Sequence, residues 1–499
     1  MKEINEKKIK YILYIGIFLF MFVWFVKVHP LVVLDGDDWG HLSFARRAIP
    51  ELSLWNPAKL FPEIFMSFCC TIAAYTIVPI TGDYILSMTL MSAIVMSGLI
   101  TLYVYSLGSC LKRLFAVSTG ASVFVEGLFL ILHFLIFRKG DVDNTYLFYC
   151  VDLNCYYNYL MPALLNASIV LLLFKNEKLT NFLQRGDNIK KGLLYVVIYF
   201  AIFSNLVDSV ILLAYASMMI LLDIFKIKSV KNEGLQFLKR NFLYFGIIFA
   251  WVISAVSEAL GGRAALSGSS DTRNLGVKLA EVISGLSTVF SWTHKMFLLL
   301  CAVLVISLVA LLVLEKRKNH KVNIYFLNQL FFWGLMLIFT FVYSVLICAK
   351  VSTRNIYRSE YLFPTLFFGL VLLMFLVGYI LEKLPKAVVL MPLLVCIMLT
   401  FVNTNLHTFK ESNYFNVSGK LCMDISRDLV NQVIEANQAG KTEIELEVSM
   451  SGHDANWPQS YAMGESMAIA LYKHGVISRP MKIKIVPSTE YNDKYLIFQ

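Results

Sequence analysis

Hydrophobic runs long enough to cross a bilayer recur along this chain as far as residue 404. A helix needs about 20 mostly apolar residues to span the hydrocarbon core. Of the 499 residues, 58% are hydrophobic and only 16% are charged, a balance that excludes a water-soluble globule. We therefore predict an all-α polytopic membrane domain over residues 1–404. Its eleven predicted spans are 11–30, 84–107, 115–137, 159–174, 192–206, 208–225, 241–258, 296–314, 324–349, 361–381 and 387–404. One long helix over 192–225 is the alternative to a hairpin there.

Basic residues are distributed unevenly between alternate loops. Loops on the side of the N-terminus hold 18 Lys and 4 Arg, whereas the opposite loops hold 5 Lys and 7 Arg. Because cytoplasmic loops carry the excess of Lys and Arg, the N-terminus is predicted to be cytoplasmic, in a bacterial plasma membrane. The same rule explains the net charge of +10 without a nucleic-acid partner. The first apolar run lacks a cleavage site, so we interpret it as a retained span.

Two segments are predicted to lie outside the membrane core on the far side. Residues 31–83 form the first outer loop, in which 62–80 is apolar. If that stretch crossed, the lysine bias would invert, so we predict an interfacial or re-entrant helix. Residues 405–499 are predicted to form a small extracytoplasmic α/β domain, with helices in 413–440 and 461–475 and strands in 441–450 and 479–488. No phosphate loop or nucleotide fingerprint occurs there.

The stretch DGDDWGH follows the first span and holds three carboxylates, Asp35, Asp37 and Asp38. In a helix Asp35 and Asp38 share a face, while in an extended chain Asp35 and Asp37 do. Closely spaced carboxylates suit a general base or a metal site. The alternative is a solvated polar helix end. His41, four residues after Asp37, is a candidate for the same site, although a lone histidine is more often only polar.

The residues DDWGHLSFARR resemble the first-loop motif of the GT-C superfamily of integral-membrane glycosyltransferases. In that family an acidic pair ends the first span and a juxtamembrane helix follows; the match places Asp37 and Asp38 on the pair and Ala45 and Arg46 in the helix. The resemblance implies transfer of a sugar from a polyprenyl-phosphate carrier to an extracytoplasmic acceptor, here a surface glycan or glycolipid. The glycine-spaced DGDD departs from the usual pair, and no WWD-type oligosaccharyltransferase motif is present.

The implied mechanism needs a base and a partner for the departing phosphate. A carboxylate accepts the proton of the acceptor hydroxyl, for which we choose Asp37, with Asp38 or Asp35 assisting, and a single displacement inverts the anomeric centre. The leaving phosphate requires cationic side chains or a divalent metal such as Mg²⁺ or Mn²⁺. In TRNIYRSE, Arg354 and Arg358 are predicted to share a helical face and grip it. The alternative is pairing with nearby carboxylates such as Glu360.

Further candidates lie in other outer segments. Arg263 follows a Gly-Gly turn and is a weaker candidate for the donor phosphate. Asn205 and Asp208 interrupt an apolar stretch and are candidates for holding sugar hydroxyls, or else form an ordinary polar turn. The tyrosine-rich loop that carries Asp141, Asp143 and Asp152 is more typical of an interfacial belt than of a sugar platform. Cys150 and Cys155 fall in that loop, and nine cysteines without paired spacing favour free thiols.

Two other functions fit a polytopic chain. An O-antigen-type polymerase or ligase also carries outer arginines, but it depends on one very large outer loop between late spans. A non-enzymatic flippase or transporter of lipid-linked glycans predicts ionisable residues near the middle of several spans, and few occur here. The acidic stretch directly after the first span favours the glycosyltransferase.

Overall fold

The protein was analysed as a computed structural model, which describes residues 2–43, 61–115, 117–137, 146–174, 188–225, 230–260, 273–319, 324–384, 386, 411–412 and 417–497. Helices dominate these residues. Eight of the described helices are long and apolar enough to cross a membrane: Glu6–Val28, Tyr84–Leu114, Leu153–Leu173, Leu206–Ile224, Gly234–Leu260, Lys295–Arg317, Ile324–Val351 and Ser359–Lys383. By length and composition, the prediction of a polytopic helical membrane protein is confirmed.

The remaining predicted spans have different outcomes. The shorter apolar helices Thr119–Leu135 and Lys191–Ile202 fall on two of them. The last predicted span, 387–404, lies outside the described residues. The stretch 192–225 is a hairpin, because the chain leaves the helix after Ile202 and the Asn205 side chain caps the next helix by accepting the Val207 N–H.

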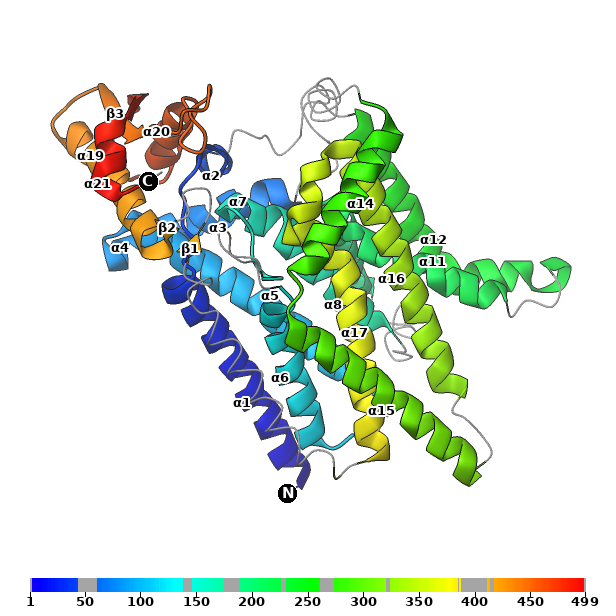
Figure 1. The fold of residues 1–499 in the computed structure, drawn as a ribbon. Helices are drawn as coiled ribbons and strands as arrows, with labels where there is room; N and C mark the ends of the chain where they lie inside the picture. The colour runs from blue at the N-terminus through cyan, green and yellow to red at the C-terminus, as the bar shows by residue number, and fades with distance from the viewer. Residues whose placement is uncertain are drawn as a thin grey trace.

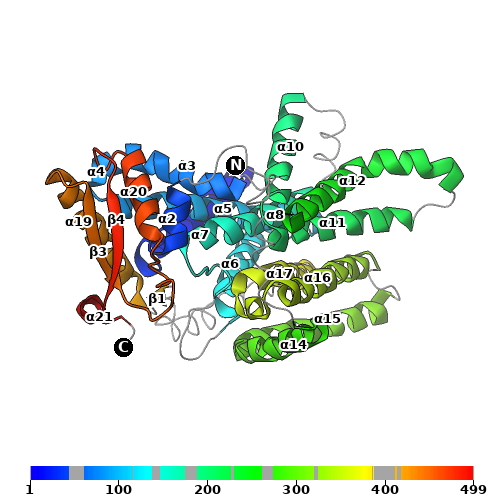
Figure 2. The ribbon, with the colours of Figure 1, turned by 90° about the horizontal axis from the view of Figure 1, so that it is seen from above.

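Helix α5 (Tyr84–Leu114) packs against several other helices of the bundle. Helix α1 (Lys2–Val23) continues into a π-helical turn, η1 (Trp24–Val28), and packs against α5. Helix α5 packs in turn on α6 (Thr119–Leu135) and α8 (Met161–Leu173), and α8 packs on α11 (Leu206–Ile224) (Figures 1 and 2). The other elements are α10 (Asn188–Ile202), α12 (Val230–Leu260), α14 (Leu275–Ser291), α15 (Lys295–Asn319), α16 (Ile324–Val351), η3 (Thr353–Tyr357) and α17 (Ser359–Lys383). Of these, α17 is mostly buried and packs on α16 and α6.

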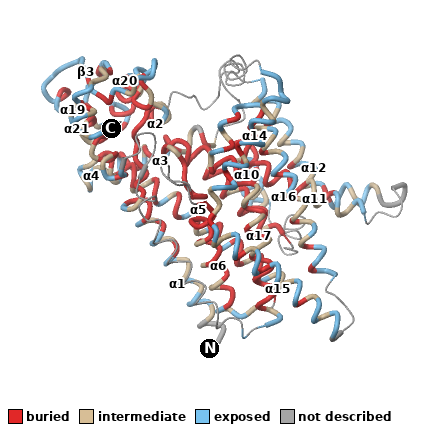
Figure 3. Tube along the Cα trace, in the orientation of Figure 1, coloured by how far each residue is buried: buried red, intermediate tan, exposed pale blue. Residues whose placement is uncertain are grey.

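Burial separates central from peripheral helices. In the most apolar window of Leu153–Leu173, 89% of residues are buried, whereas in that of Gly234–Leu260 only 11% are (Figure 3). Exposed apolar side chains on α1, α12 and α15, such as Ile12, Phe249 and Ile306, match a surface that faces lipid. The central helices therefore position side chains, and the outer ones shield them.

The first loop and the C-terminal residues meet at the end of α1 that lies away from the N-terminus (Figure 1). The loop contributes α2 (Gly36–Leu42), α3 (Phe61–Thr76) and α4 (Val78–Thr81), and α3 packs beside α2 and α5. The apolar α3 occupies the stretch predicted to be interfacial or re-entrant.

The C-terminal residues combine helices with two short sheets. Parallel strands β3 (Glu443–Ser449) and β4 (Lys482–Ser488) pair from Glu443 with Lys482, and alternate side chains such as Leu446 and Ile485 are buried. The other elements are β1 (Glu411–Ser412), β2 (Val417–Ser418), α19 (Gly419–Gln438), α20 (Met463–Lys473) and α21 (Thr489–Tyr495). Both predicted helices and both predicted strands correspond to observed elements, and α21 is additional. Helix α19 packs on α5 and α20 packs on α2.

Candidate functional site

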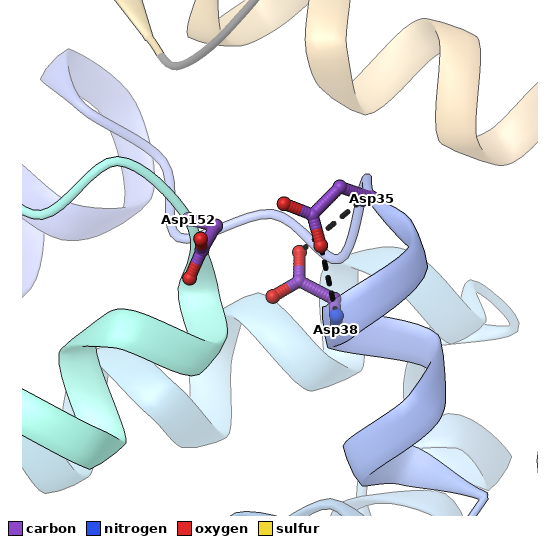
Figure 4. A group of neighbouring side chains, drawn as sticks. All are labelled: Asp35, Asp38 and Asp152. Carbon is purple, nitrogen blue, oxygen red and sulfur yellow. Dashed lines mark hydrogen bonds between the residues drawn. The ribbon is translucent and has the colours of Figure 1, made fainter. Parts of the chain in front are cut away.

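Three buried carboxylates meet just beyond the end of the first span. Asp35 and Asp38 come from the start of α2, and Asp152 comes from the segment before α8 (Figure 4). One oxygen from each lies within 4.8 Å of the other two. Asp35 and Asp38 are 0% exposed and Asp152 is 3% exposed. This cluster, the Asp triad, joins segments more than a hundred residues apart.

Local helix capping explains the positions of Asp35 and Asp38. Asp35 is the N-cap of α2, and its Oδ1 accepts the Asp38 N–H at 2.8 Å. Asp38 Oδ2 accepts the Asp35 N–H at 3.4 Å and the Leu34 N–H at 2.9 Å. This reciprocal arrangement satisfies backbone donors that a helix start leaves open. Of the two alternatives from the sequence, the helical pairing of Asp35 with Asp38 is the one found.

Asp152 is positioned by a second cap. It is the N-cap of α7 (Leu153–Cys155), and its Oδ1 accepts the Cys155 N–H at 2.5 Å while the Cys155 thiol contacts Oδ2 at 3.3 Å. The next residue, Asn154, donates its backbone N–H to Asp38 Oδ1 at 2.7 Å. Two helix starts thus face each other, and each brings its acid to the same point.

The extended segment before α2 is fixed from two sides. Thr89 of α5 donates to the Leu31 carbonyl at 2.9 Å, and Ser426 of α19 donates to the Val33 carbonyl at 2.7 Å. Both side chains are buried. Side chains of α5 and α19 therefore fix the position of the extended segment that leads to Asp35.

The glycine inside DGDD is explained by a close approach of the chain. The Gly36 N–H donates to the Pro458 carbonyl at 2.9 Å. A Cβ on Gly36 would lie 2.5 Å from Ser460 Oγ, which is too close for a real contact, and 3.6 Å from the Trp457 ring. The glycine is the point at which DGDD differs from the usual acidic pair, and its lack of a side chain leaves room for the C-terminal residues.

Burial dominates the electrostatics of the triad. It raises the pKa of the Asp35 carboxyl well above its ordinary value, and the charges of Asp38 and Asp152 raise it further. Burial, then the Asp152 charge, raises the pKa of Asp38 in the same way. Burial also raises the pKa of Asp152, and the hydrogen bonds from Cys155 partly oppose this increase. Backbone hydrogen bonds to Asp35 and Asp38 and the charge of Arg358 near Asp152 act against these increases, but the pKa values of all three carboxyls stay raised, so a bound cation would favour their charged forms.

The donor set fits a hard divalent cation. Carboxylate oxygens are the ligands that Mg²⁺ and Mn²⁺ prefer. Two oxygens bound to Mg²⁺ at about 2.1 Å lie at most about 4.2 Å apart, so the observed limit of 4.8 Å closes with a small rotation. The buried Asp35 Oδ2 has no hydrogen-bond partner within the described part of the chain. That orphaned oxygen is available as a ligand.

Asp37 and His41 lie on α2 but outside the triad. Asp37 is exposed in the first turn, and His41, half-buried, follows one helical turn later, so the two share a face as the spacing predicted. The Asp37 charge nevertheless reaches Asp35 and Asp152, since it raises the pKa of both. Asp37 is thus an accessible carboxylate beside a buried acidic cluster.

Arg358 contacts Cys155, which hydrogen-bonds to Asp152 of the triad. Its Nη2 donates to Cys155 Sγ at 3.2 Å and to Glu360 Oε1 at 2.9 Å. The guanidinium lies over the rings of Tyr159 and Tyr361, with its central carbon 5.2 and 5.8 Å from the ring centroids. The pairing with Glu360 that was the alternative is present, and the buried Nε has no partner among the described residues.

The predicted shared face of Arg354 and Arg358 is wrong. The 3-10 turn η3 ends at Tyr357, and Arg358 has extended backbone with φ of −94° and ψ of 130° as the N-cap of α17. Arg354 is exposed whereas Arg358 is partly buried. Arg263, Ala45 and Arg46 lie outside the described residues.

Asn205 is connected to the triad through two residues, Asn158 and Asn154. Asn205 donates to the Asn158 carbonyl at 2.8 Å, and the Asn158 amide donates to Asn154, whose N–H binds Asp38. Asp208 is 0% exposed in the first turn of α11. The tip of the 192–225 hairpin is therefore connected to the triad.

No protein family, no curated protein and no solved structure matches the chain. The site therefore has to be interpreted from its own chemistry.

Sequence reasoning missed Asp152 as a site residue and Tyr159 and Tyr361 as partners of Arg358. The available signal was an acid directly before the start of a span, in D-L-N-C, which is typical of an N-cap. Cys150 and Cys155 are both free, in agreement with the expectation of free thiols.

Proposed function

We propose that this chain is a membrane glycosyltransferase of GT-C type, which moves a sugar from a polyprenyl-phosphate carrier to a surface glycan or glycolipid. The observation that carries the proposal is the buried Asp triad directly after the first span, with the accessible Asp37 on the same helix. The resemblance of DDWGHLSFARR to the family's first-loop motif supports the same assignment.

Asp37 acts as the general base. It is exposed, so an acceptor hydroxyl can approach within hydrogen-bond distance of its carboxylate. The hydroxyl oxygen attacks the anomeric carbon, the bond to the carrier phosphate breaks, and Asp37 keeps the proton. One displacement inverts the anomeric centre.

The leaving phosphate accumulates negative charge. We assign Arg358 to this phosphate, because it lies between two tyrosines and contacts Cys155 beside the triad. The three carboxylates of Asp35, Asp38 and Asp152 would hold one Mg²⁺ or Mn²⁺, which supplies charge neutralisation for a phosphate oxygen. Asn205 and Asp208 line the neighbouring helix start and orient sugar hydroxyls.

The proposed orientation of the chain in the membrane follows from the distribution of its lysines. The triad and the C-terminal elements lie at one end of the bundle and the N-terminus at the other (Figure 1). With the lysine-rich loops in the cytoplasm, the site faces the outside, where lipid-linked sugars are used, and residues 405–499 form an extracytoplasmic domain.

The test is an assay of sugar loss from a panel of radiolabelled polyprenyl-phosphate hexoses, with the full chain in membranes. Asp37→Asn should lower the rate about 100- to 10 000-fold. The exposed Asp454→Asn is the matched control and should act as the natural chain. Full activity of Asp37→Asn would remove the base assignment. Movement of the donor across the membrane without loss of sugar would instead indicate a flippase.

A further inference from the structure

A polar cavity lies at the opposite end of the first span from the Asp triad. It has a volume of about 640 Å³ and opens between α1, α5 and α6. Lys7, Lys10 and Lys112 line it together with hydroxyl groups of the α6 start, Ser118 and Thr119. The proposed transfer reaction uses none of these residues. With about 1.5 Å per residue, the twenty or more helical residues between the two sites place them about a bilayer apart.

A buried acid organises the wall of this cavity. Glu126 of α6 is 0% exposed and accepts hydrogen bonds from Lys10, from the Tyr14 hydroxyl at 2.8 Å and from Ser122 Oγ at 2.8 Å. Gly108 of α5 leaves the space that Glu126 fills, because a Cβ there would clash with the carboxylate. Ionisable groups inside a membrane protein are functional candidates by default. Here the network fixes the Lys10 ammonium at the cavity.

The charge balance selects the kind of ligand. The described ionisable side chains at the cavity are three lysines, Glu6 at the rim and Glu126 behind the wall, so their formal charges sum to +1. The start of α6, a helix of 17 residues, adds the partial positive charge of its first N–H groups. A phosphodiester carries a single negative charge, which equals this net positive charge in size.

The surroundings indicate that the phosphodiester belongs to a lipid. Tyr11, which lines the cavity, is 65% exposed, and its neighbours Ile12 and Ile15 are 70% and 60% exposed. On a membrane-spanning helix such side chains contact acyl chains. A headgroup in the cavity would therefore place its acyl chains against an apolar surface of α1.

We propose that this cavity binds the headgroup of an anionic phospholipid, with Lys7, Lys10 and Lys112 on the phosphate. The inference is independent of the glycosyltransferase proposal. It concerns the lysine-rich end of the bundle, which the distribution of charges assigns to the cytoplasmic leaflet.

The experiment is native mass spectrometry of the full chain in detergent, titrated with phosphatidylglycerol or with zwitterionic phosphatidylcholine. The variant is Lys7→Ala with Lys112→Ala, both exposed, and the matched control is Lys8→Ala with Lys316→Ala, which removes the same charge outside the cavity. We expect the cavity variant to bind phosphatidylglycerol about 25-fold more weakly, at roughly five-fold per lysine, and the control to bind as the natural chain.

Three results would overturn the inference. Equal binding by the cavity variant and the natural chain would show that these lysines do not hold the lipid. If the control variant lost as much affinity for phosphatidylglycerol, the effect would be due to the net charge of the protein and not to the cavity. Displacement of phosphatidylglycerol by inorganic phosphate at the same concentration would identify a site for free anions. Thermal unfolding in lipid-free detergent, expected to be the same for all three proteins, shows whether the variants are folded.

Discussion

The backbone N–H of Asn154 donates a 2.7 Å hydrogen bond to Asp38, a residue 116 positions earlier in the chain. This bond joins the start of α2 to the start of α7, and both groups are buried. It makes the position of Asp38 dependent on the second outer segment, so changes in either segment are expected to affect one site.

The first prediction concerns cation binding by the triad. Asp38→Asn and Asp152→Asn each remove a negative ligand, so the affinity for Mn²⁺ should fall at least about ten-fold in each. Electron paramagnetic resonance of free Mn²⁺ measures this in the purified chain. Asp454→Asn, exposed and remote in the sequence, should bind as the natural protein. Undiminished Mn²⁺ binding by both triad variants would exclude the triad as the metal site.

A second prediction follows from the raised pKa values of Asp35 and Asp38. Without a cation the folded state binds protons more tightly than the unfolded state, in which the pKa is about 4. Stability of the cation-free protein should therefore decrease as the pH rises from about 4 through the raised values. Stabilisation by Mn²⁺ should change in the opposite direction, because the metal needs deprotonated carboxylates.

Thermal unfolding with EDTA and with Mn²⁺ across this pH range measures both trends. Asp35→Asn should flatten the curve obtained with EDTA, since it removes one of the buried acids. Parallel curves with and without Mn²⁺ would contradict the assignment.

The third prediction tests the role of Gly36. Gly36→Ala places a methyl group 2.5 Å from Ser460 Oγ and should displace α2, which lowers the melting temperature and the Mn²⁺ affinity. Adding Ser460→Ala removes the clashing oxygen and should restore part of both. Ser460→Ala alone should be nearly neutral. If the double variant behaved like Gly36→Ala, the close approach would not be the reason for the glycine.

The fourth prediction separates the charge of Arg358 from its shape. Arg358→Gln leaves the buried Glu360 without its partner and should lower the free energy of unfolding by about 3–5 kcal/mol. Arg358→Lys keeps the charge but loses the planar group between Tyr159 and Tyr361. We expect the lysine variant to fold and to show a raised KM for the lipid-linked donor. An unchanged KM would remove Arg358 from the phosphate site.

Patterns of short range predicted much of this architecture. Apolar runs predicted helices of spanning length, and alternation predicted the buried faces of β3 and β4. The spacing of the acids in DGDD predicted that one pair would converge, Asp35 with Asp38 in a helix or Asp35 with Asp37 in an extended chain, and the helix cap brings Asp35 and Asp38 together.

Contacts between distant segments were not predictable in this way. Asp152 joins the triad only because α7 faces α2, which no local pattern specifies. The separation of Arg354 from Arg358 depends on one residue that leaves helical geometry, Arg358 itself. The reason for Gly36 lies more than 400 residues away, in Ser460.

The bond between the Gly36 N–H and the Pro458 carbonyl has a consequence for biosynthesis. Ribosomes add roughly 5–20 residues per second, so about 20 to 80 s separate the synthesis of these two residues. Throughout that interval the acidic segment lacks the contacts that Ser426 and Pro458 later supply. We expect a nascent chain stopped before residue 458 to insert its spans and yet to bind no cation, so that the last part of the chain to be translated completes a site that the first part began.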